Sequence, residues 1–478
     1  MNTLQEKRKA KMNINEQIST WFENREDEFV AALTPLIAVD STIGEPAPGA
    51  PFGTGPAKAL KTALALAESW GLTTGEDEGY VGTADLNDKP DQLHILAHMD
   101  VVGIGDGWNT DPFTLVRDGD LIYGRGVDDD KGPAVAAMMA MRCVKELGLP
   151  LSKNVKLVLG TDEETGSRDI AHYYAHHPYA PNSVTPDSDF PVTNIEKARY
   201  APTFSAQFPA ADTTAPHLVS IHGGIRVNVA PGECRATVAG LNAAECAEIC
   251  KLAEHNTGVS FTLMNEGDKL MLVAHGAEAH ASTPDEGKNA ISALLSVLCA
   301  LPLEETPALV AARQLHSVFP FGDNAGKALG IAHEDEVSGK LTLTFSVLDL
   351  DDKGFSGQFD VRAPLCATKE NCSDVVEQKF AGFGWSCTGT MSQVHMVDAN
   401  SDFIRTLLDS YEHFSGKKGY CEAIGGGTYV HEIPGGVAFG AGDRDFESRL
   451  HGANERARLS QLLLCGKIYA SMIAGLCK

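Results

Sequence analysis

Three adjacent aspartates, Asp128, Asp129 and Asp130, stand in the stretch GRGVDDDKGPAVAAMMA at 124–140, directly before an apolar run. The flanking glycines permit tight turns, and a helix beginning after them would offer free N–H groups to anions. A helix N-terminus accommodates one or two carboxylates without a metal, so the cluster alone leaves structural and chemical roles open. The letters DDKG recur at 351–354 without a preceding GRG or a following helix, and we predict that this copy is a turn.

Carboxylates and histidines recur at four further points along the chain. They are His98 and Asp100 in HMD, Glu163 and Glu164 in GTDEETGS, Asp187 in TPDSDF, and His451 in RLHGANE. Each pattern alone is common in loops and strand ends. Together they provide imidazoles and carboxylates without cysteine, which suits zinc or manganese in a hydrolytic site. One bridging carboxylate could hold two metals at ~3.5–4 Å, sharing a water of lowered pKa.

The elements that would position these residues alternate between short apolar strands and amphipathic helices. Strands are expected at 91–100 and 154–164, and helices at 14–38, 57–70, 132–147 and 167–177. This alternation predicts an α/β layered sheet, with the acidic and histidine clusters at the ends of its elements, where α/β folds place their sites. The period of two along a strand points His98 and Asp100 to the same face, so the carboxylate could orient the imidazole.

The pattern changes between 196 and 396, where strands and helices follow one another in two weakly similar sets. This change predicts an inserted domain of two related α+β halves. The first domain would then comprise 1–195 and 397–478, with a long final helix within 454–476 returning to the first sheet.

Charge and composition restrict the possible partners and location. The 478 residues include 39 basic and 64 acidic side chains, a formal net charge of −25, which disfavours binding to nucleic acid or anionic membranes. No apolar run of the ~18 residues that span a bilayer is expected, and no hydrophobic segment follows the basic N-terminal leader, so we expect a cytoplasmic protein. The eleven cysteines, without a CxxC pair, are predicted to be mostly reduced thiols.

The motifs HMD, GRGVDDDKG, GTDEETGS, PDSDF, GAEAHASTPDEGKNA and HGANE, in this order, resemble those of the M20 family of metallopeptidases across nearly the whole chain. The length and the GGGTY loop resemble most closely its PepV-type, carnosinase-like aminoacyl dipeptidases. The resemblance implies an α/β fold in which a catalytic domain, with a central mixed sheet flanked by helices, is interrupted by an α+β lid domain.

The resemblance also implies a role for each motif residue. The implied metal ligands are His98, Asp129, Glu164, Asp187 and His451. Asp129 would bridge two metals, His98 and Asp187 would complete one shell, and Glu164 with His451 the other. Asp100 would be the carboxylate behind the ligands, and Glu163 the general base that takes a proton from the bridging water. Asp128 and Asp130 would be neighbours, not ligands.

Residues of the insertion and of the glycine loop are implied to bind the substrate. His280 would polarise the scissile carbonyl and stabilise the oxyanion. Asn228 and Arg362 would hold the substrate ends, and the N–H groups of Gly425, Gly426 and Gly427 could bind a C-terminal carboxylate. Standing alone, His280 or Arg362 would be read as a surface or packing residue.

The expected activity is metal-dependent hydrolysis of unblocked dipeptides, with Zn²⁺ as the metal and Mn²⁺ or Co²⁺ as alternatives. An aminoacylase or deacylase on the same fold, or an inactive metal-binding protein, are the alternative functions, although Glu163 would serve no purpose in the latter. The insertion of ~200 residues resembles two lid units. One chain could therefore supply both halves of the lid without a second copy, so we expect a monomer. The basic leader and the charged loop 441–449 receive no role.

Overall fold

The computed structural model describes residues 12–210, 213 and 216–478, so the basic leader at 1–11 lies outside the described residues. The chain divides into two compact units, which are described separately. Unit 1 consists of Met1–Ile195, Met396–Glu422 and Gly427–Lys478, and unit 2 of Glu196–His395 and Ala423–Gly426.

The main sheet of unit 1 is mixed, as the sequence predicts. Its strand order is β1-β2-β6-β3-β7-β24-β8-β22, and β23 also pairs with β8. The central pairs β6-β3, β3-β7 and β7-β24 are parallel, and β1-β2, β2-β6 and β24-β8 are antiparallel. The strands are β1 (Thr73–Asp77), β2 (Val81–Asp85), β3 (Asp91–His98), β6 (Asn154–Gly160), β7 (Asn182–Thr185), β8 (Val192–Glu196), β22 (His395–Met396), β23 (Cys421–Ile424) and β24 (Gly436–Ala438).

A small second sheet in unit 1 joins two segments that are far apart in the chain. Its order is β25-β5-β4, with β4 at Val116–Asp118, β5 at Leu121–Tyr123 and β25 at Arg456–Arg458. The antiparallel β5-β25 pair sets Tyr123 opposite Arg456, so the loop that follows β5 lies beside the segment that precedes β25.

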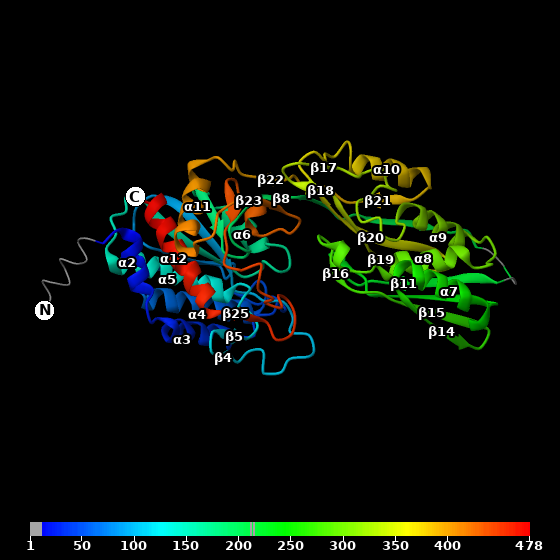
Figure 1. Ribbon diagram of the computed structural model, residues 1–478, viewed down its shortest axis with the longest axis horizontal. Coiled ribbons are helices and arrows are strands. Elements are labelled where there is room, and N and C mark those ends of the chain that lie inside the picture. Colours follow the sequence, from blue (N-terminus) through cyan, green and yellow to red (C-terminus); the bar gives the residue numbers. More distant parts are fainter. Residues whose placement is uncertain (1–11, 211–212, 214–215) are drawn as a thin grey trace, which may run out of the picture. The chain divides into compact units, whose positions relative to one another are not determined.

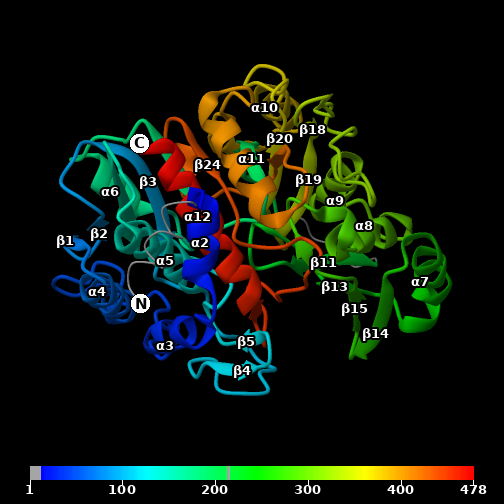
Figure 2. The same cartoon turned by 60° about the vertical axis from the view of Figure 1, so that its left-hand side comes forward.

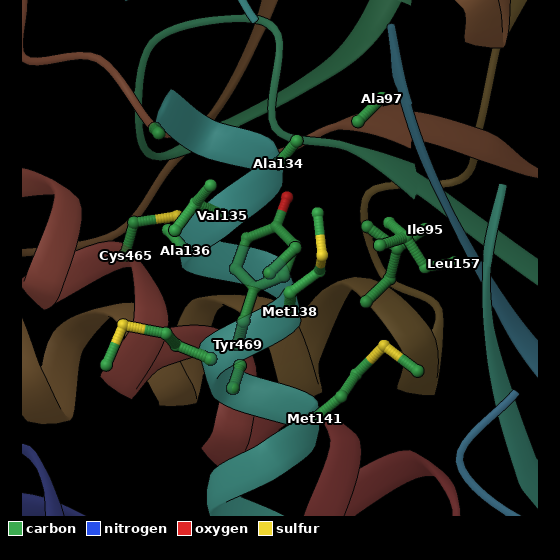
Figure 3. Packing of buried hydrophobic residues seen from close by; sticks show 14 of the residues in the cluster. Ile95, Ala97, Ala134, Val135, Ala136, Met138, Met141, Leu157, Cys465 and Tyr469 are labelled. Carbon is green, nitrogen blue, oxygen red and sulfur yellow. The ribbon is translucent and has the colours of Figure 1, made fainter. Parts of the chain in front are cut away.

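The core of unit 1 forms between helices and the main sheet. Helix α5 packs against α12 and β3, and α12 also packs against α2 and α11 (Figures 1 and 2). In Figure 3, Met138 of α5 and Tyr469 of α12 point into the same apolar cluster, and the Tyr469 hydroxyl donates to the Phe439 carbonyl at 2.8 Å. The helices are α2 (Ile14–Phe22), α3 (Glu26–Ile37), α4 (Thr54–Ser69), α5 (Lys131–Leu147), α6 (Arg168–Tyr174), α11 (Asp402–Ser415), α12 (Leu459–Leu476) and the 3₁₀ turn η2 (Tyr429–Glu432).

The structure corrects three sequence expectations about helices and apolar runs. The helix expected at 14–38 is two helices, because the chain turns at Asn24, whose φ is 58°. The final helix begins only at Leu459, since the preceding residues pair with β5. Among the described residues α12 alone is long and apolar enough to cross a membrane, contrary to the expectation that no run reaches this length, and more than half of it is buried inside the protein.

Unit 2 contains a second large sheet with helices packed against it (Figure 1). Its order is β14-β15-β13-β11-β19-β20-β10-β21, with β9 pairing with β20. The strands are β9 (Ala198–Tyr200), β10 (Thr203–Gln207), β11 (His217–Gly223), β13 (Glu233–Ala239), β14 (Ser260–Glu266), β15 (Lys269–His275), β19 (Thr342–Leu350), β20 (Gly354–Ala363) and β21 (Ser386–Thr388). The helices are α7 (Ala243–Thr257), α8 (Ala290–Ala300), α9 (Pro307–Val318), α10 (Ser373–Gly382) and the 3₁₀ turn η1 (Pro284–Glu286).

The order of this sheet reflects two α+β halves. Strands β11 and β19 lie side by side in the middle, with β13, β15 and β14 on one flank and β20, β10 and β21 on the other. Helix α7 follows β13 and α10 follows β20. The second DDKG is the turn between β19 and β20, where the Asp351 carboxylate accepts the N–H groups of Lys353 and Gly354, so this prediction is confirmed. Two short ribbons complete the unit, β12-β16 (Val229–Ala230, Ala279–His280) and β17-β18 (Glu334–Asp335, Gly339–Lys340).

Candidate metal centre

Three of the five candidate ligands lie at the carboxyl ends of parallel strands of unit 1. His98 ends β3 and lies opposite Gly160, the last residue of β6, in the parallel register. Glu164 follows β6 and Asp187 follows β7, while Asp129 lies two residues before the start of α5. Because the carboxyl ends of parallel strands meet at one sheet edge, loops from distant parts of the chain converge there.

The five implied ligands form two groups that share Asp129. In each group, one ligand atom from each residue lies within 4.8 Å of the others: His98, Asp129 and Asp187 form one group, and Asp129, Glu164 and His451 the other. Asp129 Oδ1 lies 2.8 Å from His98 Nε2, and Oδ2 lies 2.9 Å from His451 Nε2. One carboxylate therefore faces two imidazoles, which is the arrangement that a bridging ligand requires.

The outer carboxylate of each group lies slightly farther from its histidine. Asp187 Oδ2 is 3.9 Å from His98 Nε2, and Glu164 Oε1 is 3.4 Å from His451 Nε2. Apart from this ion-pair contact with His451, the buried Glu164 Oε1 has no hydrogen-bond partner among the residues that the structure describes. A buried carboxylate oxygen without a donor is costly unless a cation satisfies it, so these donors fit divalent metal ions.

The electrostatics of the centre attract positive charge. Burial, reinforced by the Asp129 charge, raises the pKa of Asp187 to about 7, and burial likewise raises the pKa of Glu164. Burial alone would lower the pKa of His451, but its contacts with Asp129 and Glu164 prevail and raise it to about 11. The pKa of His98 rises for the same reason, through Asp100 and Asp129. A site that holds protons this firmly also favours a metal cation in their place.

Asp100 contacts the candidate ligand His98, as expected, and Glu163 follows β6 beside Glu164. The Asp100 carboxylate accepts the backbone N–H groups of Glu163 and Glu164 at 3.2 and 3.1 Å. His98 Nδ1 lies 3.0 Å from the Asp100 carbonyl oxygen and 3.5 Å from its carboxylate. The carbonyl and the carboxylate of Asp100 therefore both face the imidazole, and the carboxylate also holds the Glu163–Glu164 loop. Burial and the Asp187 charge raise the pKa of Glu163 well above its ordinary value.

Neither neighbour of Asp129 belongs to the ligand groups. Asp130 is buried and its Oδ2 accepts the backbone N–H of His98 at 3.1 Å. Burial raises the pKa of Asp128 to about 7, against the opposing hydrogen bond from Ser448. Both aspartates therefore flank the candidate ligand Asp129 without joining either group.

Unit 2 brings together most of the implied substrate-binding residues. The β12-β16 pair sets Val229 opposite His280, and the N–H of Ala281 donates to the Asn228 carbonyl at 2.9 Å. Arg362 donates through Nη1 to the Gly425 carbonyl. A Cβ added to Gly425 would lie 2.8 Å from the Ser282 Cβ, so Gly425 also adjoins the His280 segment. Gly426 follows in unit 2, whereas Gly427 belongs to unit 1.

The orientation of His280 is set by the residue two positions on. Its Nδ1 lies 2.6 Å from the Ser282 hydroxyl and accepts the Ser282 N–H at 3.3 Å. Since Nδ1 accepts a backbone N–H, a neutral His280 carries its proton on Nε2.

Several residues of these sites escaped the sequence analysis. Asp360 is buried and accepts Arg362 Nε at 2.5 Å and Arg199 Nε at 2.9 Å, so it fixes the guanidinium. The spacing of two in FDVRAP, which places Asp360 and Arg362 on one strand face, could have revealed it. Asp169 accepts the N–H of Thr161 at 2.5 Å and the Tyr429 hydroxyl at 2.5 Å, which joins the loop after β6 to η2.

Known proteins resemble this chain over most of its length. Residues 94–475 match the model of peptidase family M20/M25/M40. The Beta-Ala-Xaa dipeptidase of Lactobacillus delbrueckii subsp. lactis is 34% identical over 468 residues, which covers 95% of this chain and 97% of that protein.

Solved structures share the fold at low sequence identity. Human carnosine dipeptidase 1 superimposes with a TM-score of 0.56 at 15% identity, covering 97% of this chain and 100% of that one. The dipeptidase Dug1p of Saccharomyces cerevisiae superimposes with a TM-score of 0.56 at 14% identity, covering 97% of this chain and 98% of that one.

Proposed function

The chain belongs to peptidase family M20/M25/M40 and is a metallopeptidase, and from this premise we propose that it hydrolyses unblocked dipeptides at a centre of two divalent metal ions. The observation that carries the proposal is the Asp129 carboxylate, which faces the imidazoles of His98 and His451 at 2.8 and 2.9 Å. These two histidines come from opposite ends of the chain, and such convergence on one carboxylate supports a shared metal ligand.

We propose that His98, Asp129 and Asp187 hold one metal ion and that Asp129, Glu164 and His451 hold the other. Zn²⁺ is the proposed ion, with Mn²⁺ or Co²⁺ as alternatives, since oxygen and imidazole donors suit all three. When bound, such ions lower the pKa of a water molecule and polarise the scissile carbonyl.

Glu163 is the proposed general base. It follows β6 at the same sheet edge as the ligands, and its backbone is fixed by the Asp100 carboxylate at 3.2 Å. Glu163 would take a proton from the attacking water and deliver it to the leaving amine. Its raised pKa, caused first by burial and then by the Asp187 charge, suits a group that must also donate the proton.

Unit 2 would contribute groups that bind and polarise the substrate. Nε2–H of His280 is the proposed donor to the developing oxyanion, because Nδ1 is occupied by the Ser282 N–H at 3.3 Å. Arg362, fixed by the buried Asp360, and Asn228 would hold the substrate ends, and the N–H groups of Gly425, Gly426 and Gly427 would bind a terminal carboxylate.

We also propose a cytoplasmic location and a monomer. All eleven cysteines are free, as expected for a reducing compartment. The monomer proposal depends on unit 2, whose sheet contains two α+β halves. Because one chain supplies both halves, no second copy is needed to complete the unit.

The test is a substrate panel assayed with and without metal. The purified chain would be stripped with a chelator and offered dipeptides, including β-alanyl dipeptides because of the related enzyme's name, together with tripeptides and N-acetyl amino acids. We expect hydrolysis of free dipeptides, its loss on chelation, and its return as two ions per chain are restored. Preference for N-acetyl amino acids would identify a deacylase instead, and metal binding without hydrolysis an inactive protein.

A further inference from the structure

Arg125 and Glu455 form a buried ion pair between the aspartate loop and the His451 segment. Arg125 is 1% exposed and Glu455 is fully buried, and Arg125 Nη1 donates to Glu455 Oε2 at 2.7 Å. Arg125 belongs to the GRG that precedes the aspartates, and Glu455 ends the HGANE segment that contains His451. The pair therefore joins the two segments that carry the bridging ligand and one of its histidines.

The Glu455 carboxylate organises the aspartate loop through its backbone. Its Oε1 accepts the N–H groups of Gly126 at 3.0 Å, Asp128 at 2.9 Å and Asp129 at 3.3 Å. The loop is neither helix nor strand at these positions, and Gly126 has a φ of 93°, so no secondary structure fixes its path. Together with backbone bonds such as that from the Gly132 N–H to the Gly126 carbonyl, this carboxylate constrains where the Asp129 main chain lies, and hence where its side chain can reach.

The Arg125 guanidinium performs the corresponding task for the His451 loop. Its Nη2 donates to the carbonyl oxygens of His451 at 3.3 Å and Gly103 at 3.2 Å. His451 has a φ of 59°, and Arg449 and Asn454 have similar positive values. Non-glycine residues rarely adopt this conformation, and it persists only where surrounding contacts hold it.

We propose that the Arg125–Glu455 pair positions the metal ligands, with Glu455 holding Asp129 and Arg125 holding His451. The inference rests on the proposed metal centre. Replacing a buried ion pair by apolar groups is often neutral for stability, so stability alone gives this pair no clear role. Its hydrogen bonds instead go mainly to the segments that carry the proposed ligands. Substituting groups that orient metal ligands typically weakens metal affinity by about 10- to 100-fold.

The test compares two substitutions that loosen different ligands. Glu455→Gln places an amide donor against Arg125 or the loop N–H groups, so it should weaken both metal sites, because both use Asp129. Arg125→Lys keeps a positive charge beside Glu455 but cannot reach the His451 carbonyl with a second nitrogen. It should weaken the site that contains His451 more than the site that contains His98.

Metal affinity is measured by titrating the stripped full-length chain with Zn²⁺ against a fluorescent chelator, with His451→Ala identifying the His451 site. Dissociation constants are expected to rise by about 10- to 100-fold in the affected sites. The matched control is Asn154→Ala, at the amino end of β6, which removes partly buried hydrogen bonds to Asp85 and Asp91 of 2.6 and 2.7 Å. It should lower the melting temperature and leave Zn²⁺ affinity within threefold of wild type.

The outcomes separate failure of the pair from failure of the proposed function. Wild-type Zn²⁺ affinity in folded Glu455→Gln and Arg125→Lys, or a loss in Arg125→Lys confined to the His98 site, would overturn the inference. Should Glu455→Gln not fold, Arg125→Lys decides alone, because it retains the charge pair. A wild-type chain that binds no Zn²⁺, Mn²⁺ or Co²⁺ would overturn the metal centre itself.

Discussion

Asp129 and Glu163 lie at one sheet edge, yet the proposed mechanism gives them separable tasks. Glu163→Gln preserves the shape of the side chain but removes its capacity to take a proton, so we expect kcat to fall by about 10²–10⁴ while both metals stay bound. Asp129→Ala removes the carboxylate that faces both histidines and should release both metals. Activity and metal content of the purified variants are the measurements, and turnover of Glu163→Gln near the wild-type rate would refute the general-base assignment.

Asp169 gives a prediction about pH and stability. Burial raises the pKa of Asp169 from its ordinary 3.8 to about 6, against the opposing hydrogen bond from Tyr429. The folded protein therefore binds more protons than the unfolded chain between these values, and its stability decreases as pH rises through that window, by up to about 3 kcal/mol. Above the window the loss should be constant.

Asp169→Asn isolates this contribution because the amide does not titrate. Melting temperatures of wild type and variant would be measured in chelator from pH 4.5 to 7.5. Up to about pH 6 the wild type should lose stability relative to the variant, and above that pH the difference between the two should stay constant. Tyr429→Phe removes a hydrogen bond that lowers this pKa, so it should extend the window upward. Parallel pH profiles for wild type and Asp169→Asn would show that Asp169 is not the titrating group.

At the residue scale, the sequence identified side chains with known motif positions better than those that support them. His98, Asp129, Glu164, Asp187 and His451 were chosen by motif, and the structure brings them into two groups. Arg125 and Glu455 are 330 positions apart, and their contact depends on a strand pair that leaves no local pattern. The Asp100 carboxylate lies 3.5 Å from His98 Nδ1, as its side chain was expected to, but it also accepts two backbone N–H groups, which no sequence pattern indicates.

At the element scale, the junction between the aspartate loop and α5 depends on Gly132. Its N–H donates to the Gly126 carbonyl at 3.0 Å, and a Cβ there would collide with the Val127 carbonyl oxygen. Gly132→Ala must therefore displace backbone next to Asp129. We expect a cost of about 1–3 kcal/mol from the forced fit, and a loss of Zn²⁺ affinity that chelator competition can measure.

Gly103→Ala is the control for this prediction, because a Cβ at Gly103 meets open space. It should leave both melting temperature and Zn²⁺ affinity near wild type. If Gly132→Ala kept full Zn²⁺ affinity, the backbone position at the start of α5 would not determine the position of the Asp129 carboxylate.

Element types were easier to predict than their ends and partners. The alternation of apolar runs predicted β3, α5 and β6, whose residues are mostly buried. Apolar periodicity across 14–38 predicted one helix. It missed the turn at Asn24, because a single residue in the left-handed conformation does not interrupt the pattern of apolar residues. Nor could periodicity show that β24, from the end of the chain, lies between β7 and β8.

At the scale of the whole molecule, the candidate chemistry is divided between two units. The proposed metal ligands and Glu163 belong to unit 1, and His280 to unit 2. If His280 stabilises the oxyanion, His280→Ala should fold and retain its metals but lose about 10²–10³ in kcat. If it only packs, the same substitution would reduce the melting temperature and leave the rate per folded molecule within about threefold of wild type.

Whether both units of one active site come from the same chain can be decided by mixing two inactive variants. Glu163→Gln has an impaired unit 1 and an intact unit 2, and His280→Ala the reverse. In the proposed monomer each chain supplies both groups, so a mixture should show only the sum of the two residual rates, and light scattering should give the mass of one chain, 50.9 kDa. If unit 2 of one copy instead served unit 1 of another, mixed dimers would combine an intact Glu163 with an intact His280. Activity would then rise well above that sum, and the monomer proposal would fail while the assigned roles of Glu163 and His280 gained support.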